Sequence, residues 1–394
     1  MLNKEEFKKH LCEGIIPFWK SLRDDEFGGY YGFMDYDLNI DKKAVKGCIL
    51  NSRILWFFSN AYMVLKEDKS LSDSLMDEAR HAYEFMKDRC LDNENGGIFW
   101  SMTYDGKPED TMKHTYNQAF AIYALSSYYD ISKDEGALDK ALSLFNTIET
   151  KCRDEIGYLE ALDRNFNIIS NEALSENGIL ADRTMNTLLH VFEAYTELYR
   201  VTGNELVKEK LVQIINAFAD KVYNPKLNRQ EVFFNNKWES LIDLHSYGHD
   251  IETAWLMDKG VDILGDEEIK AKMSPITKAL TKKIYEVAFD GSSLANECEN
   301  GVVDERRIWW VQAETVLGFM NGYLKDNEKS EYMTAAEKQW QFIKDYVIDK
   351  RNGSEWFKEV RKDGTPYEGL EIVEPWKCPY HNGRMCIEVM RRMK

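Results

Sequence analysis

Apolar residues recur at three- and four-residue steps along most of the chain, which is the spacing of one buried face of an α-helix. In residues 182–200, for example, Met185, Leu188, Phe192 and Tyr195 follow this spacing. The pattern predicts about twelve helices, at 3–22, 48–66, 71–89, 113–130, 135–149, 182–200, 205–220, 249–264, 266–288, 306–324, 330–347 and 380–393. Only seven prolines are present, which also favours long helices.

Short segments rich in glycine and aromatic residues punctuate the helical pattern. They begin near Gly29, Gly97, Gly157, Phe233, Gly291 and Gly353. Their spacing is regular, roughly 60 to 75 residues, which is typical of a repeat architecture. Six units of two helices each predict an all-α fold, an (α/α)6 barrel with short β-hairpins in the loops at one end. An open solenoid of the same units is the alternative. The sequence contains no linker rich in proline, glycine or serine, so residues 1–394 are expected to form a single catalytic domain.

Charge and cysteine usage narrow the class of protein. The net charge of −17 argues against binding nucleic acid or anionic membranes, because both need a basic surface. No stretch approaches the ~20 apolar residues of a membrane span, and the charged N-terminal segment does not resemble a signal peptide. The seven cysteines are scattered without a CxxC pair, which favours reduced thiols. We expect a cytoplasmic monomer or weak homodimer that acts on a small molecule.

Two histidines stand in compact polar motifs far apart in the chain. His249 lies in SYGHDIE at the start of a predicted helix, and His381 lies in WKCPYHNGR just before the last helix. Two imidazoles brought together suggest proton transfer on two sides of a carbon atom. Glu252, three residues after His249, is predicted to orient that ring. His245 and His249 also have the spacing of a metal pair, but no convincing third ligand accompanies them, so we expect no metal.

Polar side chains interrupt three other apolar helices. Arg53 has donors that suit a sugar oxygen or a developing oxyanion, although it could instead pair with a structural carboxylate. Tyr116 is a candidate for a cavity wall or for the core. Asn186 and His190 lie one helical turn apart, and they either bind hydroxyl groups or form a hydrogen-bonded pair in the core.

Aromatic residues beside acidic ones are typical of carbohydrate sites. Trp310 and Glu314 lie one turn apart, so the indole is predicted to stack on a sugar ring while the carboxylate binds its hydroxyls. The alternative for Glu314 is a structural hydrogen bond. Trp376, just before the His381 motif, is a second stacking candidate.

Five blocks in order give the chain a specific resemblance. NSRILWFF, MNTLLHVFEAYT, SYGHDIETAWL, WWVQAETVLGF and WKCPYHNGRMC resemble those of the N-acylglucosamine 2-epimerase superfamily, and most closely its cellobiose 2-epimerase branch. The similarity covers roughly residues 10–392. It implies an (α/α)6 barrel without a metal or redox cofactor, and a pair of catalytic histidines that match His249 and His381. It also matches substrate-contacting or supporting positions to Arg53, Tyr116, Asn186, His190, Glu252, Trp310, Glu314 and Trp376.

The resemblance implies reversible epimerisation at C2 of the reducing-end glucose of a β-1,4-linked disaccharide. The sugar ring would open, and the C2 proton would leave and return through an enediolate. An aldose–ketose isomerase and an epimerase of the N-acylglucosamine or mannose type stay open within the superfamily. A glycosidase would need two carboxylates about the scissile bond, and the acid-rich composition does not exclude it. A carbohydrate-binding protein would explain the aromatic residues but not the paired imidazoles.

Overall fold

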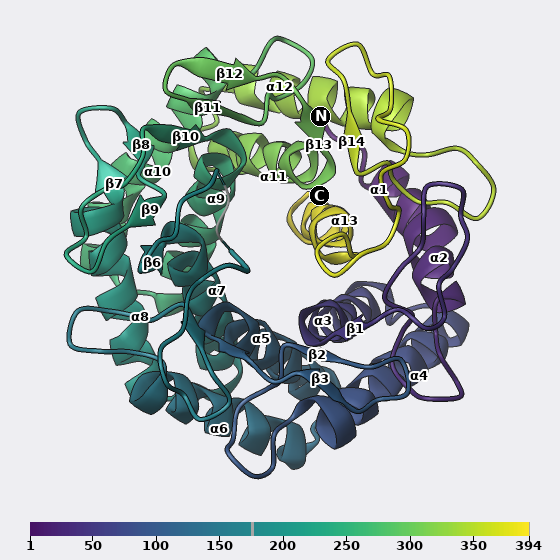
Figure 1. Cartoon of the computed structure of the whole chain (residues 1–394). Coiled ribbons are helices and arrows are strands. Elements are labelled where there is room, and N and C mark those ends of the chain that lie inside the picture. Colours follow the sequence, from purple (N-terminus) through teal and green to yellow (C-terminus); the bar gives the residue numbers. More distant parts are fainter. Residues whose placement is uncertain (175–176, 394) are drawn as a thin grey trace.

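The computed structural model describes residues 1–174 and 177–393, whose helices form two concentric rings (Figure 1). The inner ring consists of α3 (Cys48–Leu65), α5 (Thr115–Ser132), α7 (Met185–Thr202), α9 (Tyr247–Leu264), α11 (Trp309–Lys325) and α13 (Tyr380–Arg392). The outer ring consists of α1 (Lys4–His10), α2 (Ile16–Ser21), α4 (Lys69–Phe85), α6 (Glu135–Lys151), α8 (Glu205–Ala217), α10 (Glu267–Val287) and α12 (Ser330–Phe342).

The inner ring closes on itself. Helix α13 packs against both α11 and α3, so the last inner helix contacts the first. A β-bridge between Met34 and Val373 joins the two ends of the chain in the same way. The predicted (α/α)6 barrel is therefore confirmed, and the open solenoid is excluded.

Each predicted helix has a counterpart, but several boundaries differ. The first predicted helix is α1 and α2 joined by a π-helical turn over Leu11–Ile15. Further π-helical turns extend three outer helices over Met86–Cys90, Phe218–Val222 and Ile343–Val347. Three predicted helices begin late, at Thr115, Met185 and Trp309, because the residues before them are extended and pair with a neighbouring repeat.

The short strands connect successive repeats, at the end of the barrel that faces the viewer in Figure 1. The antiparallel pairs are β1 (Lys46–Gly47) with β2 (Ser101–Met102), β2 with β3 (Pro108–Asp110), β4 (Lys113–His114) with β5 (Ala161–Leu162), β6 (Arg183–Thr184) with β9 (Phe233–Phe234), β7 (Tyr223–Asn224) with β8 (Arg229–Gln230), β10 (Leu244–Ser246) with β11 (Glu297–Glu299), β11 with β12 (Val302–Asp304), and β13 (Arg307–Ile308) with β14 (Glu359–Val360). The predicted hairpins at one end are thereby confirmed.

Buried ion pairs fix these loops to the inner helices. The ammonium nitrogen of Lys46, just before α3, lies 2.5 Å from Oδ2 of Asp24. Lys113 repeats this contact one unit later, with Nζ 3.0 Å from Oδ2 of Asp92. Removing one partner of such a pair leaves an unpaired buried charge, which typically costs about 3–5 kcal/mol. These two loops are therefore anchored beside the inner helices that follow them.

Among the described residues, no helix has the length and apolar character that crossing a membrane requires.

Candidate active site

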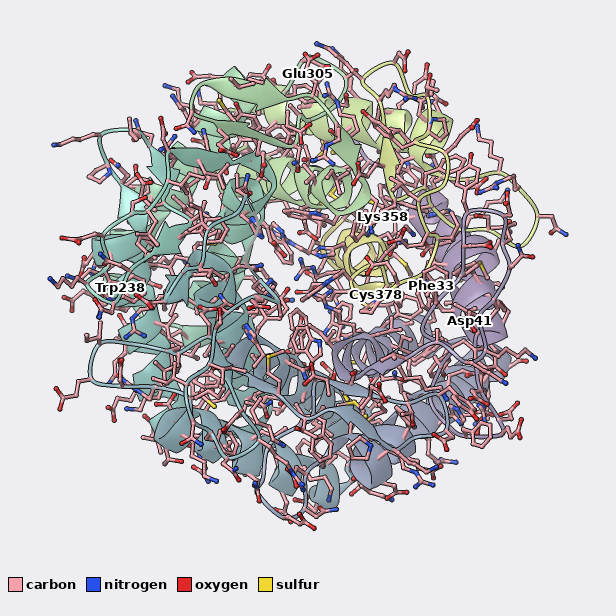
Figure 2. All side chains as sticks on the ribbon, viewed as in Figure 1. Phe33, Asp41, Trp238, Glu305, Lys358 and Cys378 are labelled. Carbon is pink, nitrogen blue, oxygen red and sulfur yellow. The ribbon has the colours of Figure 1, made fainter. Side chains whose placement is uncertain are left out.

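A cavity of about 360 Å³ lies where the inner helices begin. Its lining is formed by Arg53, Tyr116, Ala173, Leu174, Asn186, His190, His249, Glu252, Ile308, Trp309, Trp310, Lys358, Glu359, Glu374, Trp376 and His381. Every predicted site residue except Glu314 is among them. Lys358 and Cys378 lie beside the central opening in Figure 2, whereas Trp238 and Glu305 lie at the periphery.

A second cavity, of about 520 Å³, is lined by residues near the opposite ends of the inner helices, among them Asn60, Lys259 and Glu388. It is the larger of the two, but its lining contains no imidazole among the described residues. Several of its charged groups are paired with one another, as Lys259 Nζ is with Glu388 Oε1 at 2.9 Å. The acid–base chemistry therefore belongs to the smaller cavity.

His249 stands in the first turn of α9, where Ser246 holds it in place. The Nδ1 atom of His249 lies 2.8 Å from Oγ of Ser246. Ser246 precedes the helix but makes no capping hydrogen bond to the helix backbone, so its hydroxyl is free for the ring. Burial, with a smaller contribution from the charge of His190, lowers the pKa of His249 to about 3. The ring is therefore neutral at neutral pH and can act as a base.

His381 stands at the start of α13, and its Nδ1 atom lies 2.8 Å from Oε1 of Glu314. Burial, together with the charges of Arg384 and Arg53, lowers its pKa below the ordinary value of histidine. The Trp310 ring lies beside both imidazoles, with centroids 4.8 Å from that of His249 and 5.5 Å from that of His381. Two segments more than a hundred residues apart thus place two neutral imidazoles on one pocket.

The prediction that Glu314 binds sugar hydroxyls is wrong. Its side chain is 0% exposed and lies below the cavity lining. In addition to the His381 contact, Oε2 of Glu314 accepts a hydrogen bond from Nε1 of Trp255 at 2.9 Å. Glu314 therefore orients a histidine, and Trp310 lines the pocket without it.

The prediction that Glu252 orients His249 is also wrong. Ser246 holds Nδ1 of His249, whereas Oε1 of Glu252 accepts a hydrogen bond from Arg384. The carboxyl lines the cavity, and burial together with the charge of Glu314 raises its pKa to about 7. A carboxyl with this pKa can exchange a proton near neutrality.

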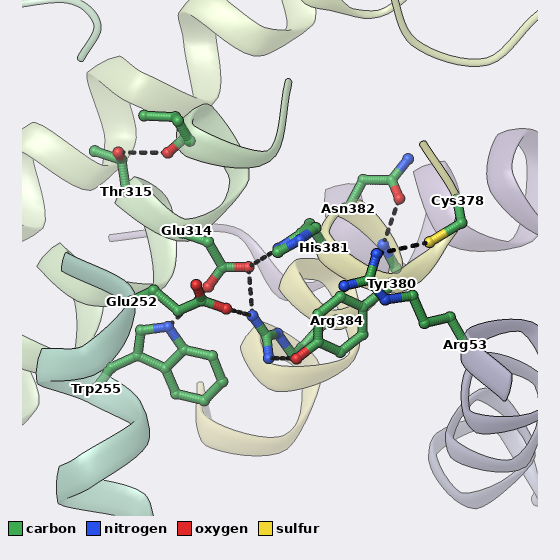
Figure 3. Close-up of polar contacts among 12 residues, drawn as sticks. Arg53, Glu252, Trp255, Glu314, Thr315, Cys378, Tyr380, His381, Asn382 and Arg384 are labelled. Atoms are coloured by element: carbon green, nitrogen blue, oxygen red, sulfur yellow. Dashed lines mark hydrogen bonds and ion pairs between the residues drawn. The ribbon is translucent and has the colours of Figure 1, made fainter. Parts of the chain in front are cut away.

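The carboxyls of Glu252 and Glu314 and the ring of His381 lie within 4.8 Å of one another, close enough to hold a metal ion. Both carboxyls, however, already accept hydrogen bonds from the guanidinium of Arg384 (Figure 3). The positive charge that this cluster requires is thus supplied by the protein itself. This donor set does not call for a metal.

Arg53 reaches the cavity from α3. Its Nη2 donates to the hydroxyl of Tyr116 at 2.8 Å, and its Nη1 donates to the carbonyl oxygen of Trp376 at 3.3 Å. Its Cζ lies 4.2 Å from the centroid of the Phe120 ring. None of the ion pairs among the described residues involves Arg53. The structure therefore does not support the alternative in which Arg53 pairs with a structural carboxylate. An unpaired guanidinium at the pocket suits negative charge on a bound molecule.

The remaining predicted polar residues also reach the cavity, but not as a pair. Nδ1 of His190 lies 3.0 Å from Oε2 of Glu193, and no hydrogen bond joins it to Asn186 within the described ranges. Oδ1 of Asn186 has no hydrogen-bond partner among the described residues. The expected alternative of a hydrogen-bonded core pair is therefore excluded for these two residues.

Sequence reasoning missed several residues at or below the site, among them Ser246, Arg384, Lys358 and Glu374. Ser246 and Arg384 stand inside motifs already singled out, three residues before His249 and three residues after His381. Helical spacing could have found both, because residues three apart lie on one face. Lys358 and Glu374 line the rim, with Nζ 3.3 Å from Oε1, and they lie in a loop without a periodic signal.

The double helical ring and its imidazole-lined pocket define an acid–base enzyme of the (α/α)6-barrel class. The N-acylglucosamine 2-epimerase family model matches residues 28–382, and the chain belongs to this family. Within it, the chain falls in the cellobiose 2-epimerase branch, and it is an isomerase of the epimerase type.

The relatives are similar from end to end. The chain is 52% identical to a cellobiose 2-epimerase of Ruminococcus albus over 98% of both chains, and 43% identical to that of Dictyoglomus turgidum over 99% and 98%. The crystal structure of a sugar epimerase from a ruminal bacterium matches with a TM-score of 0.97 at 51% identity, covering 99% of both chains. The structure of cellobiose 2-epimerase from Bacillus thermoamylovorans matches with a TM-score of 0.95 at 44% identity, again covering 99% of both chains. A GH76 α-mannanase, at 12% identity and a TM-score of 0.65, shares the fold alone.

Proposed function

We propose that the protein catalyses reversible epimerisation at C2 of the reducing-end glucose of β-1,4-linked disaccharides. Cellobiose would give 4-O-β-D-glucosyl-D-mannose, and lactose would give epilactose. The observation that carries this proposal is the pair His249 and His381, two separately oriented neutral imidazoles beside the same tryptophan ring. The similarity to cellobiose 2-epimerases over the whole chain supports the choice of substrate.

The chemistry begins with opening of the hemiacetal, because the C2 hydrogen becomes acidic only beside an aldehyde. One neutral histidine then takes the C2 proton and leaves an enediolate, and the other histidine, once it has taken up a proton from solvent, gives that proton to the opposite face of C2. Each ring is held through Nδ1, by Ser246 or by Glu314, which leaves Nε2 for the substrate. We assign Arg53 to the enediolate oxygen, because a fixed cation stabilises charge that develops there.

Glu252 suits the opening and closing of the sugar ring. Its raised pKa, about 7, allows the carboxyl to give a proton to the ring oxygen and to take it back. The carboxyl lines the cavity beside His381, so it lies near the reducing end when that histidine faces C2.

The other lining residues are assigned to substrate holding. Trp310 and Trp376 offer apolar ring faces to sugar C–H groups, and Tyr116, Asn186 and His190 offer hydrogen bonds to hydroxyls. The volume of about 360 Å³ is within the range of small-molecule sites, roughly 300–1,000 Å³. The seven free cysteines support the cytoplasm as the proposed location.

Product analysis of cellobiose incubated with the purified enzyme tests the proposal. We expect 4-O-β-D-glucosyl-D-mannose as the main product, with a small amount of 4-O-glucosyl-fructose, because the same enediolate can be protonated at C1. The ketose as main product would identify an aldose–ketose isomerase. Free glucose would identify a glycosidase. The His381→Gln variant, purified in parallel, controls for contaminating activities.

A further inference from the structure

Arg384 lies directly below the catalytic pocket and joins its carboxylates. It stands on α13 one turn after His381, is fully buried, and does not line the cavity. Its Nη1 donates to Oε1 of Glu193 at 2.6 Å. Its Nη2 donates to Oε1 of Glu314 at 2.7 Å and to Oε1 of Glu252 (Figure 3). One guanidinium thus serves three carboxyls from three inner helices.

Two aromatic rings fix the plane of this guanidinium. Its Cζ lies 4.1 Å from the ring centroid of Tyr380 and 4.9 Å from that of Trp255. Guanidinium groups stack on aromatic faces while their edges stay free to donate hydrogen bonds, which an ammonium group cannot reproduce. The direction of each N–H of Arg384 is therefore set by the surrounding core.

Two of the three carboxyls hold a histidine of the pocket. Glu314 contacts Nδ1 of His381 through the same Oε1 atom that Arg384 binds. Glu193 contacts Nδ1 of His190 through Oε2 and binds Arg384 through Oε1. The buried guanidinium of Arg384 is thus connected through one carboxyl to His381 and through another to His190, and both of these imidazoles line the cavity.

The charged hydrogen bond from Nη2 of Arg384 to Oε1 of Glu314 decides which partner donates in the contact of Glu314 with His381. An ionised carboxylate only accepts, so Nδ1 of the ring must carry the proton, and Nε2 keeps its lone pair. A protonated Glu314 would donate to Nδ1 and move the ring proton to Nε2, which then could not take a proton from carbon. Three carboxyls without a cation in a space closed to water would take up protons, because their charges repel and burial penalises them.

We propose that Arg384 is a positioning residue, which holds Glu314 and Glu193 as hydrogen-bond acceptors and so fixes the ring orientation and tautomer of His381 and His190. Its relevance to turnover rests on the proposed function, whereas the arrangement itself can be tested without substrate.

The surrounding charges agree with this role. Burial raises the pKa of Glu314, and Arg384 opposes the rise. Burial acts on Glu193 in the same direction, but the charge of Arg384 and the contact with His190 bring its pKa below the ordinary value. The charged and titratable groups that face this cluster are Arg53 from α3, Tyr116 and Tyr123 from α5, His190 and Glu193 from α7, His249 and Glu252 from α9, Glu314 from α11, and Tyr380 and His381 from α13.

The variants Arg384→Lys and Arg384→Met test the proposal. Lysine keeps the charge, but its single ammonium nitrogen cannot replace two separate donor nitrogens on the three carboxyls, so Glu314 loses its hydrogen bond. Methionine loses the charge as well. Arg391→Lys is the matched control, because Arg391 lies at the other end of the same helix and pairs with Glu388 and Asn60. Three quantities are compared: kcat and KM for cellobiose, the pH profile of kcat/KM, and the tautomer of His381 by ¹⁵N NMR of histidine-labelled protein.

For Arg384→Lys we expect kcat to fall about 10- to 100-fold, as misplacement of a catalytic group does, with KM within about threefold of the wild type. The acid limb of kcat/KM should move to higher pH, since Glu314 then takes its proton more readily. The His381 spectrum should change from the Nδ1–H to the Nε2–H form. The control should match the wild type in all three.

An unchanged kcat and pH profile in Arg384→Lys, or a loss of kcat with His381 still in the Nδ1–H form, would overturn the proposal. If Arg384→Met does not fold, the lysine variant alone decides. If the wild-type enzyme forms no epimer, the proposed function fails, while the ¹⁵N spectra of the same variants still decide whether Arg384 sets the tautomer.

Discussion

Nδ1 of His381 lies 2.8 Å from Oε1 of Glu314, a carboxyl that is fully buried on the neighbouring inner helix. The buried carboxylate of a Ser-His-Asp triad stands in the same relation to its histidine, where it fixes the tautomer and stabilises the imidazolium. His249 has only the hydroxyl of Ser246 at the equivalent atom. The two imidazoles are therefore not equivalent, and His381 is the one whose charged form is stabilised by a direct partner.

This difference predicts a strong effect of Glu314→Gln. An amide can donate to Nδ1 and so select the wrong tautomer, which in a triad lowers kcat about 10⁴-fold. We expect kcat for cellobiose to fall by roughly 10²–10⁴, with little change in KM. Steady-state kinetics measure this, and Glu305→Gln is the control, because Glu305 pairs with Lys362 at the periphery of the molecule. A Glu314→Gln enzyme with native kcat would show that Glu314 does not orient His381.

Both histidines are predicted to be required. His249→Ala and His381→Ala should each lower turnover at least 10²–10⁴-fold, the usual contribution of a general acid or base, and should keep the native circular dichroism spectrum. His81→Ala is the control, because Nε2 of His81 contacts the carbonyl oxygen of Gly29 and the ring does not line the pocket. Near-native turnover by a folded His381→Ala protein would remove the two-base assignment.

Chelators are predicted to leave the activity unchanged. The guanidinium of Arg384 already provides the positive charge between Glu252 and Glu314. Dialysis against EDTA followed by the cellobiose assay tests this. Activity that is lost in EDTA and restored by a stoichiometric divalent ion would contradict it, and would place a metal among Glu252, Glu314 and His381.

The fold could be predicted from the sequence because its repeats are local. Apolar spacing gave the helices, and the glycine-rich segments gave the number of repeats. The π-helical turns at the ends of outer helices have no such signal. The extended residues before Thr115 and Trp309 were missed because their partners lie in another repeat.

The pocket residues were largely predictable, but their pairing was not. Helical spacing assigned Glu252 to His249, whereas in the closed ring Glu252 contacts Arg384 from a facing helix. Glu314 contacts His381 from the neighbouring inner helix. Such contacts depend on how the inner helices are rotated, and the spacing along one helix does not contain that information.

Trp376 is predicted to hold the second sugar of a disaccharide. It lies at the cavity with its ring centroid 5.9 Å from that of Tyr116 and 5.8 Å from that of Trp100. Trp376→Ala should raise KM for cellobiose more than for a monosaccharide substrate, because only the disaccharide loses the stacking contact. An equal increase for both substrates would place Trp376 beside the reducing sugar.

Proton NMR of cellobiose with the enzyme in heavy water tests the central claim most directly, since it reports the product and the fate of the C2 proton together. If His249 and His381 exchange the C2 proton through an enediolate, glucosyl-mannose appears with deuterium at C2 of the reducing sugar. Repeated turnover should also bring deuterium into the remaining cellobiose. Glucosyl-mannose that keeps its original C2 hydrogen throughout repeated turnover would contradict the account.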